Sequence, residues 1–213
     1  MAQRGNQIKR ENTKFQSLCA RPNIRLLASA SIAYGLSMTE NVPQSAITRH
    51  ALLKRLTDLG LAHTTFDHPP IFTVAEGAHI KAKMPGGHTK NLFLKDKAGT
   101  LFLISAIADT VIPINKLHPI LGSKRLSFGK ADLLFEMLGV TPGSVTVFAV
   151  MNDKAHNVQL ILDAALFEHD IVNFHPMKND ATTAISPKDL LTFVRSEHHE
   201  PVIIDFKTLQ PVR

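Results

Sequence analysis

Apolar and polar residues follow two spacings along this chain, one typical of helices and one typical of short strands. From Ser45 to Gly60, apolar side chains recur every three to four residues, with a serine that can cap a helix and a glycine that can end it. Thr73 and Glu76 have the spacing of a capping box, which predicts a second, short helix. The predicted helices are 45–60, 73–80, 114–121, 130–138 and 186–195.

Short apolar runs separated by turn residues predict the strands. The runs at 92–94 and 101–106 are expected to pair through a polar turn. A Thr-Pro-Gly-Ser turn at 141–144 leads into a further predicted strand at 145–151. The other predicted strands are 62–67, 158–162, 171–174 and 202–206. Because strands and helices are interleaved in an irregular order, the pattern predicts an α+β fold with a mixed sheet rather than a doubly wound one.

Positive charge is distributed unevenly along the chain. The 213 residues carry a net charge of +6, of which residues 1–37 alone contribute +5. In the near-neutral remainder, residues 77–131 hold nine Lys or Arg against Asp96 and Asp109, whereas residues 132–213 are net negative. A local basic region on a near-neutral body suits a bound polyanion, although a chance cluster of surface lysines gives the same count.

Composition limits the chemistry that the chain can carry. No apolar run is long enough to span a bilayer, so a soluble protein without membrane association is expected. The single cysteine, Cys19, excludes an internal disulfide or a cysteine-based metal cluster and suits a reducing cytoplasm. Eleven histidines occur without a metalloprotease motif, and a Gly-x-Ser-x-Gly motif is absent. We therefore expect no metal, no cofactor and no covalent catalysis.

The first 37 residues differ from the rest in composition. They are rich in Arg, Asn and Ser and poor in acids, as organelle transit peptides are. The sequence from Met38 onward opens like a folded domain, so Met38 is the favoured initiator. We expect residues 1–37 to be an extension, disordered or outside the true start, that the domain at 38–213 does not need for folding or activity.

One stretch, residues 84–97, combines a flexible loop with the start of a predicted strand. Gly86 and Gly87 expose backbone N–H groups, and Lys90 and Asn91 follow where the loop is expected to become a strand. A cation and an amide beside exposed N–H groups can hold a phosphate or a ribose. A solvated lysine at the start of an edge strand is the simpler interpretation.

Two further loop-to-strand positions complete a candidate constellation, namely the Gly143-Ser144 turn and His175. Loops at the ends of strands often carry functional groups, whereas a half-buried histidine with satisfied hydrogen bonds is the simpler interpretation of His175. Together with the 84–97 stretch, these positions suit the binding of an anionic substrate and its hydrolysis without a protein nucleophile.

Four ordered segments carry recognisable motifs: FDHPPIFTVAEG, GGHTKNLFLKDK, TPGSVTVFAVMND and LDAALFEHDIVNFHP. Together they resemble the bacterial prolyl-tRNA editing family, also called the YbaK-like aminoacyl-tRNA deacylases. The resemblance runs from about Ala46 to Phe206 and is strongest to the freestanding branch that removes alanine from mischarged tRNA(Pro). It implies a mixed, partly barrel-like sheet with flanking helices and an enzyme of translation fidelity.

The resemblance also implies a role for each matching residue. Lys90 would hold the 3′-terminal nucleotide of tRNA, and His175 would line the aminoacyl pocket and limit its size. Gly143 begins the family's Gly-x-x-x-Pro motif, in which Val147 stands where the family has proline. The implied catalytic set is Lys90, Gly143 and His175, and the implied substrate contacts are Asn91, Val74, Ser144 and Phe174.

The chemistry can be stated from physical principles. An aminoacyl ester is already activated, so the protein must mainly position water or the vicinal ribose hydroxyl and stabilise the developing oxyanion. Backbone N–H groups after Gly143 are the expected donors. Because alanine is smaller than proline, a tight apolar wall can admit the first and exclude the second, with weak hydrolysis of seryl-tRNA expected.

The expected partner is the acceptor end of mischarged tRNA(Pro). Prolyl-tRNA synthetase stays open as a second partner, and so does the choice between a monomer and a homodimer. Two other functions also stay open. A non-catalytic RNA-end or synthetase-associated binding module of the same fold would account for Val147. A hydrolase of free amino-acid esters would leave the basic region without a purpose.

Overall fold

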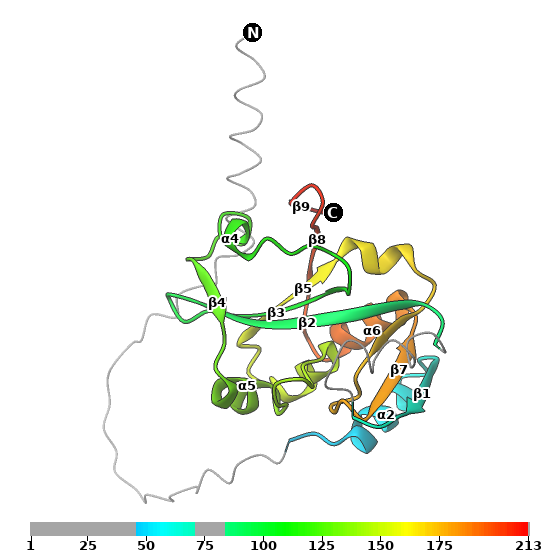
Figure 1. Cartoon of the computed structure of the whole chain (residues 1–213). Coiled ribbons are helices and arrows are strands. Elements are labelled where there is room, and N and C mark those ends of the chain that lie inside the picture. The colour runs from blue at the N-terminus through cyan, green and yellow to red at the C-terminus, as the bar shows by residue number, and fades with distance from the viewer. Residues whose placement is uncertain (1–45, 71–83, 213) are drawn as a thin grey trace, which may run out of the picture. The chain divides into compact units, whose positions relative to one another are not determined.

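The computed structural model describes residues 46–70 and 84–212 (Figure 1). Within these residues the sheet has the strand order β1-β7-β6-β2-β3-β5-β8-β9, and β4 pairs with β2 outside that path. The pairs β2–β6, β3–β5 and β5–β8 are parallel, and the others are antiparallel. The predicted α+β fold with a mixed sheet and flanking helices is therefore confirmed.

The helices and strands follow the chain in this order: α2 (Arg49–Asp58), β1 (His63–Asp67), β2 (Gly87–Asp96), β3 (Leu101–Ile107), α4 (Ile114–Leu117), β4 (Leu126–Phe128), α5 (Ala131–Leu138), η1 (Val147–Asn152), β5 (Val158–Asp163), η2 (Ala164–Glu168), β6 (Val172–Phe174), β7 (Ala181–Ile185), α6 (Pro187–Ser196), β8 (Val202–Asp205) and β9 (Gln210–Pro211). The η elements are 3-10 helices. Among the described residues, no helix combines the length and the apolarity needed to cross a bilayer.

The predicted helices α2, α5 and α6 are confirmed, with one change of cap. Thr48 caps α2, since its hydroxyl accepts a hydrogen bond from the N–H of Ala51 at 3.2 Å. Ser45, the predicted cap, lies outside the described residues. Ser186 caps α6 as predicted, and Gly139 ends α5 in the left-handed conformation with a φ of 63°.

Two predicted elements are wrong in type or length. The apolar run at 145–151 was expected to be a strand, but it forms η1, which is capped by Thr146. Residues 147–151 of η1 are all buried, so the run has no exposed face from which a period can be read. The predicted helix at 114–121 is limited to the four residues of α4. The predicted helix at 73–80 lies outside the described residues.

Adjacent residues of β2 belong to two different cores, one on each face of the sheet. Phe93 packs with Phe148 and Phe193 in a core that also takes residues from α2, α5, α6 and η1. Leu94 packs with Phe102 and Leu117 in a smaller core that includes residues from α4 and β4. Side chains thus cover both faces of the sheet. Polar side chains on β2 therefore need hydrogen-bond partners within the protein.

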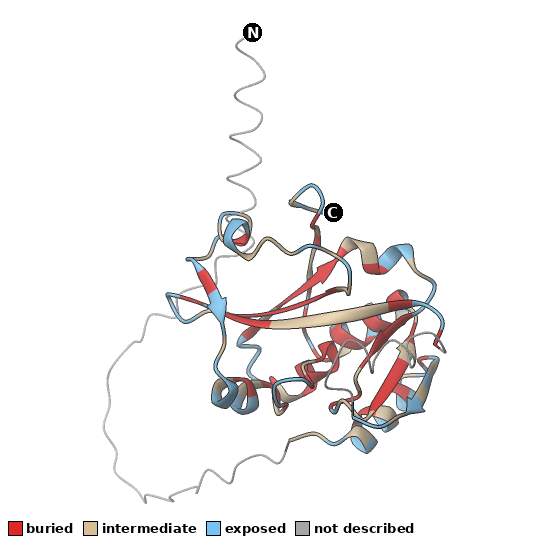
Figure 2. Cartoon of the chain, viewed as in Figure 1, coloured by how far each residue is buried: buried red, intermediate tan, exposed pale blue. Residues whose placement is uncertain are grey.

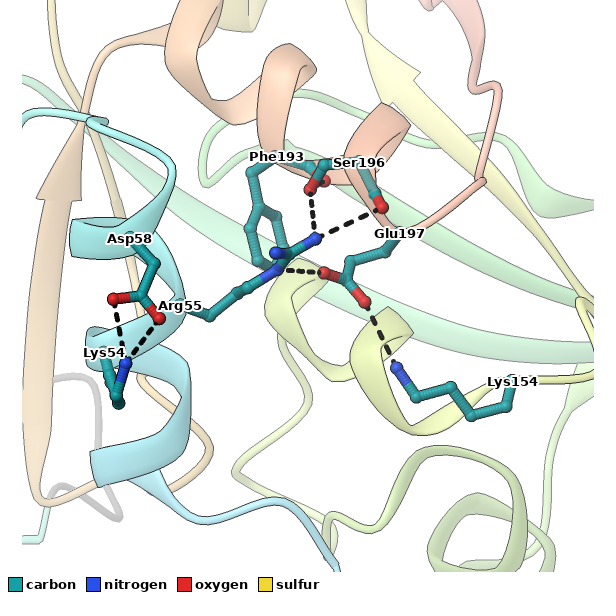
Figure 3. Close-up of polar contacts among 7 residues, drawn as sticks. All are labelled: Lys54, Arg55, Asp58, Lys154, Phe193, Ser196 and Glu197. Atoms are coloured by element: carbon teal, nitrogen blue, oxygen red, sulfur yellow. Dashed lines mark hydrogen bonds and ion pairs between the residues drawn. The ribbon is translucent and has the colours of Figure 1, made fainter.

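An ion-pair network joins α2 to the end of α6 (Figure 3). Glu197, whose side chain is only 7% exposed, accepts from Arg55 at 2.8 Å and from Lys154 at 3.2 Å. Arg55 also donates to the carbonyl and the hydroxyl of Ser196, both at 3.4 Å. One carboxylate therefore binds two cations from segments far apart in the chain.

Candidate functional site

Lys90 lies inside β2 rather than at the junction of a loop and a strand. The strand already begins at Gly87, whose N–H donates to the carbonyl of Ile171 at 2.8 Å, before β6. Gly86, with a φ of 96°, forms the turn that precedes it. The predicted junction is therefore displaced by three residues toward the N-terminus, because the pairing with β6 extends the strand.

The ammonium group of Lys90 is held by backbone carbonyls beyond the end of β3. It donates to the carbonyl of Ala108 at 2.7 Å and to that of Thr110. The hydroxyl of Thr110 donates in turn to the carboxylate of Asp163 at 2.6 Å, and Asp163 is 2% exposed. An ammonium has three donors, so one remains without a partner among the described residues. The cation is fixed in place and can still bind an anion.

Lys90 shares a face of the sheet with residues at the end of β6. His88 and Asn173 are in register across the parallel pair β2–β6, and residues in register point to the same side. Side chains two residues apart share a face, so Lys90 and Asn173 lie on the same face. His175, one residue beyond β6, continues the alternation. The predicted pair Lys90 and His175 is thus placed on one face of neighbouring strands.

Asn173 was not predicted as a site residue, and its environment makes it a candidate. It is 3% exposed, and its amide nitrogen donates to the carbonyl of Pro85 at 3.0 Å and to that of Gly87. Its amide oxygen has no hydrogen-bond partner among the residues that the structure describes. A buried acceptor of this kind is costly unless a ligand or water satisfies it. The sequence signal was an asparagine inside an otherwise apolar strand.

A second histidine, His68, lies beside His175 and was also missed. The two rings are 6.5 Å apart and edge to face. His68 Nε2 lies 2.9 Å from the hydroxyl of Thr182, and His175 Nδ1 lies 3.1 Å from the carbonyl of Ala181. Both rings are therefore held by contacts with β7. His68 precedes two prolines, and that fixed turn was its only sequence signal.

Asn91 and Phe174 lie on the opposite face of the sheet from Lys90. The amide oxygen of Asn91 accepts a hydrogen bond from the hydroxyl of Ser105, which is fully buried. Phe174 is 1% exposed and packs edge to face against Phe148, with 5.7 Å between ring centroids. The structure therefore gives both residues interior contacts, and their substrate contacts stay predictions.

The predicted turn at Gly143 and Ser144 is confirmed as a turn. The N–H of Ser144 donates to the carbonyl of Thr141 at 3.0 Å, and Gly143 has a φ of 87°. No heavy atom lies within 4 Å of the position that a Cβ on Gly143 would take. Glycine is thus needed for its backbone conformation and not for close packing. Val74 lies outside the described residues, so its predicted contact stays a prediction.

No group of three or more His, Cys, Asp or Glu side chains that could hold a metal ion occurs among the described residues.

Comparison with solved structures defines the class of fold. A hypothetical protein, APE2540, has a TM-score of 0.59 and 22% sequence identity, over 72% of this chain and 97% of that one. Residues 68–193 match the aminoacyl-tRNA editing domain family. The chain belongs to this family, and the resemblance to prolyl-tRNA editing proteins is confirmed.

Two curated relatives show how far the similarity extends. Prolyl-tRNA synthetase associated domain-containing protein 1 of Bos taurus is 39% identical over 74% of this chain and 95% of its own length. The prolyl-tRNA editing protein ProX of Acetoanaerobium sticklandii is 33% identical over 70% of this chain and 91% of its own length. The shared region is nearly the whole of each relative.

Proposed function

We propose that this chain hydrolyses mischarged alanyl-tRNA(Pro) in trans, releasing alanine and leaving the tRNA intact. The observation that carries this proposal is the fixed ammonium of Lys90 on the same face as Asn173 and His175, in a chain of the aminoacyl-tRNA editing family. The proposal places the enzyme in the cytoplasm, with the acceptor end of tRNA as its substrate.

Lys90 binds the phosphate or ribose of the terminal nucleotide through its remaining donor. The two carbonyls that hold the ammonium restrict its motion before substrate arrives, so less conformational freedom is lost on binding. A fixed cation also orients the ester that follows the phosphate. Orientation is a large part of catalysis for an ester that is already reactive.

Asn173 supplies an acceptor for the α-ammonium of the aminoacyl group, since its buried amide oxygen has no partner within residues 46–70 and 84–212. His68 and His175 bound the space beside it. Water, oriented by the vicinal ribose hydroxyl, attacks the ester carbonyl and gives up a proton. The tetrahedral oxyanion is stabilised by backbone N–H groups after Gly143 other than that of Ser144, which is used within the turn. Collapse of the intermediate breaks the bond to the ribose oxygen, which leaves with a proton, and alanine is released. A wall at His175 admits alanine and excludes the larger proline.

The direct test is a deacylation assay with the purified chain on alanyl-, seryl- and prolyl-tRNA(Pro). We expect rapid hydrolysis of the alanyl ester, weak hydrolysis of the seryl ester and none of the prolyl ester. Equal rates on all three would contradict selection by size. Substitution N173D, which keeps the shape but adds a charge, is expected to alter KM, whereas N179D is a control on the following loop.

A second candidate function is a non-catalytic binding module. It is favoured by Val147, which stands where the editing proteins have proline, and by the bovine relative, whose name describes an associated domain and no reaction. A binding module predicts tight binding of tRNA(Pro) with no turnover of any aminoacyl ester. Prolyl-tRNA synthetase is then the partner to test in a pull-down with the full chain.

A further inference from the structure

A cluster of exposed cations lies at the end of β2 that is far from Lys90. We define this basic tip by five residues: Lys95, Lys97, Lys124, Arg125 and Lys130. All five are exposed, and they come from β2, the β2–β3 turn, and the segments on either side of β4 (Figure 2). Lys95 is in register with Ser127 of β4, so the cations meet across one strand pair. The function proposed above assigns them no role.

A buried carboxylate holds the parts of the tip together. Asp96 is 5% exposed, and its two oxygens accept from the N–H groups of Ala98, Thr100 and Lys124 at 2.8 to 2.9 Å. Burial opposes ionisation of this carboxyl, but the main-chain donors outweigh burial and lower its pKa. The β2–β3 turn and the start of β4 are therefore fixed to each other, and the cations are presented by a rigid frame.

An exposed aromatic ring lies within the same frame. Phe128 of β4 is 66% exposed, although it pairs in register with Leu94, which is fully buried. The N–H of the neighbouring Gly129 donates a hydrogen bond to the carbonyl of Phe93 at 3.0 Å. A Cβ at Gly129 would lie 2.4 Å from the Phe93 ring. The backbone beside Phe128 is thus pinned, and the phenylalanine ring remains accessible.

We propose that the basic tip binds the sugar–phosphate backbone of the RNA substrate several nucleotides away from its 3′ end, and that Phe128 packs on an unpaired base. Lys95 is in register with Ser127 and therefore points to the other face from Phe128, so cations and ring lie on the two sides of the edge strand β4. Positive charge together with an exposed aromatic ring is the combination that single-stranded nucleic acid requires. The first acids that follow the basic tip in the sequence are Asp132 and Glu136. Both lie on α5, where the positively charged surface ends.

The length of β2 sets the spacing between the two contacts. Lys90 and Leu94, the residue in register with Phe128, lie four residues apart on one face of β2, which corresponds to about 14 Å. A nucleic-acid strand advances about 3.4 Å per nucleotide when stacked, so the tip reaches RNA several nucleotides beyond the terminal one. This inference rests on the proposed function for the identity of the RNA, and it assigns the affinity for tRNA to a surface separate from the reacting ester.

The test is binding of uncharged tRNA(Pro), followed by fluorescence anisotropy at several salt concentrations. The double variant K95Q/R125Q is expected to bind about tenfold more weakly at low salt and to lower the salt slope by one to two, since each lost phosphate contact removes about one counterion. The matched control is K188Q/K207Q, which removes the same charge from exposed positions elsewhere. F128A is expected to weaken binding about tenfold through lost stacking.

The outcomes separate this inference from the proposed function. Hydrolysis of alanyl-tRNA(Pro) with equal tRNA binding by K95Q/R125Q and the control pair would overturn the basic tip as an RNA site. Tip-dependent binding without any hydrolysis would support the tip and refute the deacylase. An alanyl ester of adenosine, which is too short to reach the tip, should be hydrolysed equally by the tip variants and by the wild type.

Discussion

The ammonium of Lys90 lies 2.7 Å from the carbonyl oxygen of Ala108, so this cation is positioned by the segment that directly follows β3, the strand paired with its own. A surface lysine usually samples many rotamers, and its ordering on binding costs free energy. The Lys90 side chain is already ordered by two backbone carbonyls before any ligand is present, so binding orders it no further. The placement explains how a single lysine can serve as a precise anchor.

Replacing Lys90 with methionine should abolish most turnover and leave the fold intact. K90M keeps the apolar stem but removes the charge, so deacylation of alanyl-tRNA(Pro) is expected to fall by about a hundredfold or more. The free energy of unfolding should fall by only about 1 kcal/mol, because two carbonyls lose a donor. K188M on α6 is the control, and wild-type rates in K90M would refute the anchor role.

Proline should be tolerated at position 147. Val147 is the first residue of η1, where proline is favoured, and Thr146 before it is extended, with φ −148° and ψ 150°. We expect V147P to fold with unchanged stability or to gain about 0.5 kcal/mol from a restricted unfolded chain. Thermal melting and the deacylation rate of V147P together measure whether the family proline alters activity. A large loss of stability would contradict the geometry.

Acid should destabilise the domain through His199. Burial lowers the pKa of this imidazole, and the nearby charge of Asp153 offsets the effect only in part, with His156 also opposing protonation. The unfolded chain binds the proton more readily, so the stabilising contribution is present above the ordinary pKa of about 6.5 and is lost as pH falls below it.

Urea unfolding at pH 7.5 and at pH 5.5 measures this loss. The wild type and the exposed control H50Q should lose more stability between the two pH values than H199L does, because leucine cannot be protonated. Equal pH dependence in all three proteins would assign the acid sensitivity to other groups.

Glu197 and Glu200 offer a matched pair of carboxylates for a stability test. Glu197 is buried and binds two cations, whereas Glu200 pairs with Arg195 on the surface, with side chains 70% and 53% exposed. E197Q should lower the free energy of unfolding by about 2 kcal/mol, since it leaves Arg55 and Lys154 without a charged partner (Figure 3). E200Q should cause no measurable change. Chemical denaturation of both variants decides the comparison.

Several parts of the fold could be predicted because they are encoded locally. Ser186 and Gly139 are end signals that act within one turn of their helices, and the apolar run at 101–106 forms a strand that pairs with the preceding strand β2 across a short turn. The prediction of a strand at 145–151 was wrong because the residues of η1 are buried on every side. Neither the spacing of a helix nor that of a strand is therefore visible in the sequence.

The candidate site was only partly predictable for a related reason. Lys90 and His175 were visible as polar residues beside strands, but Asn173 and His68 acquire meaning only through the pairing of β2, β6, β7 and β1. The pairings β2–β6 and β1–β7 join residues more than eighty positions apart, and no local signal records them. The amide oxygen of Asn173 lacks a hydrogen-bond partner among the described residues, and this too can be seen only in the folded chain.

The register between the parallel strands β2 and β6 has two residue pairs, Gly87 with Val172 and His88 with Asn173. Lys90 lies on β2 and His175 directly follows β6, so this short pairing sets the distance between them. A small change of twist there alters the separation of the two side chains while leaving both cores packed. Mutations at Gly87 or Val172 therefore offer a way to tune the width of the candidate site while Lys90, Asn173 and His175 stay unchanged.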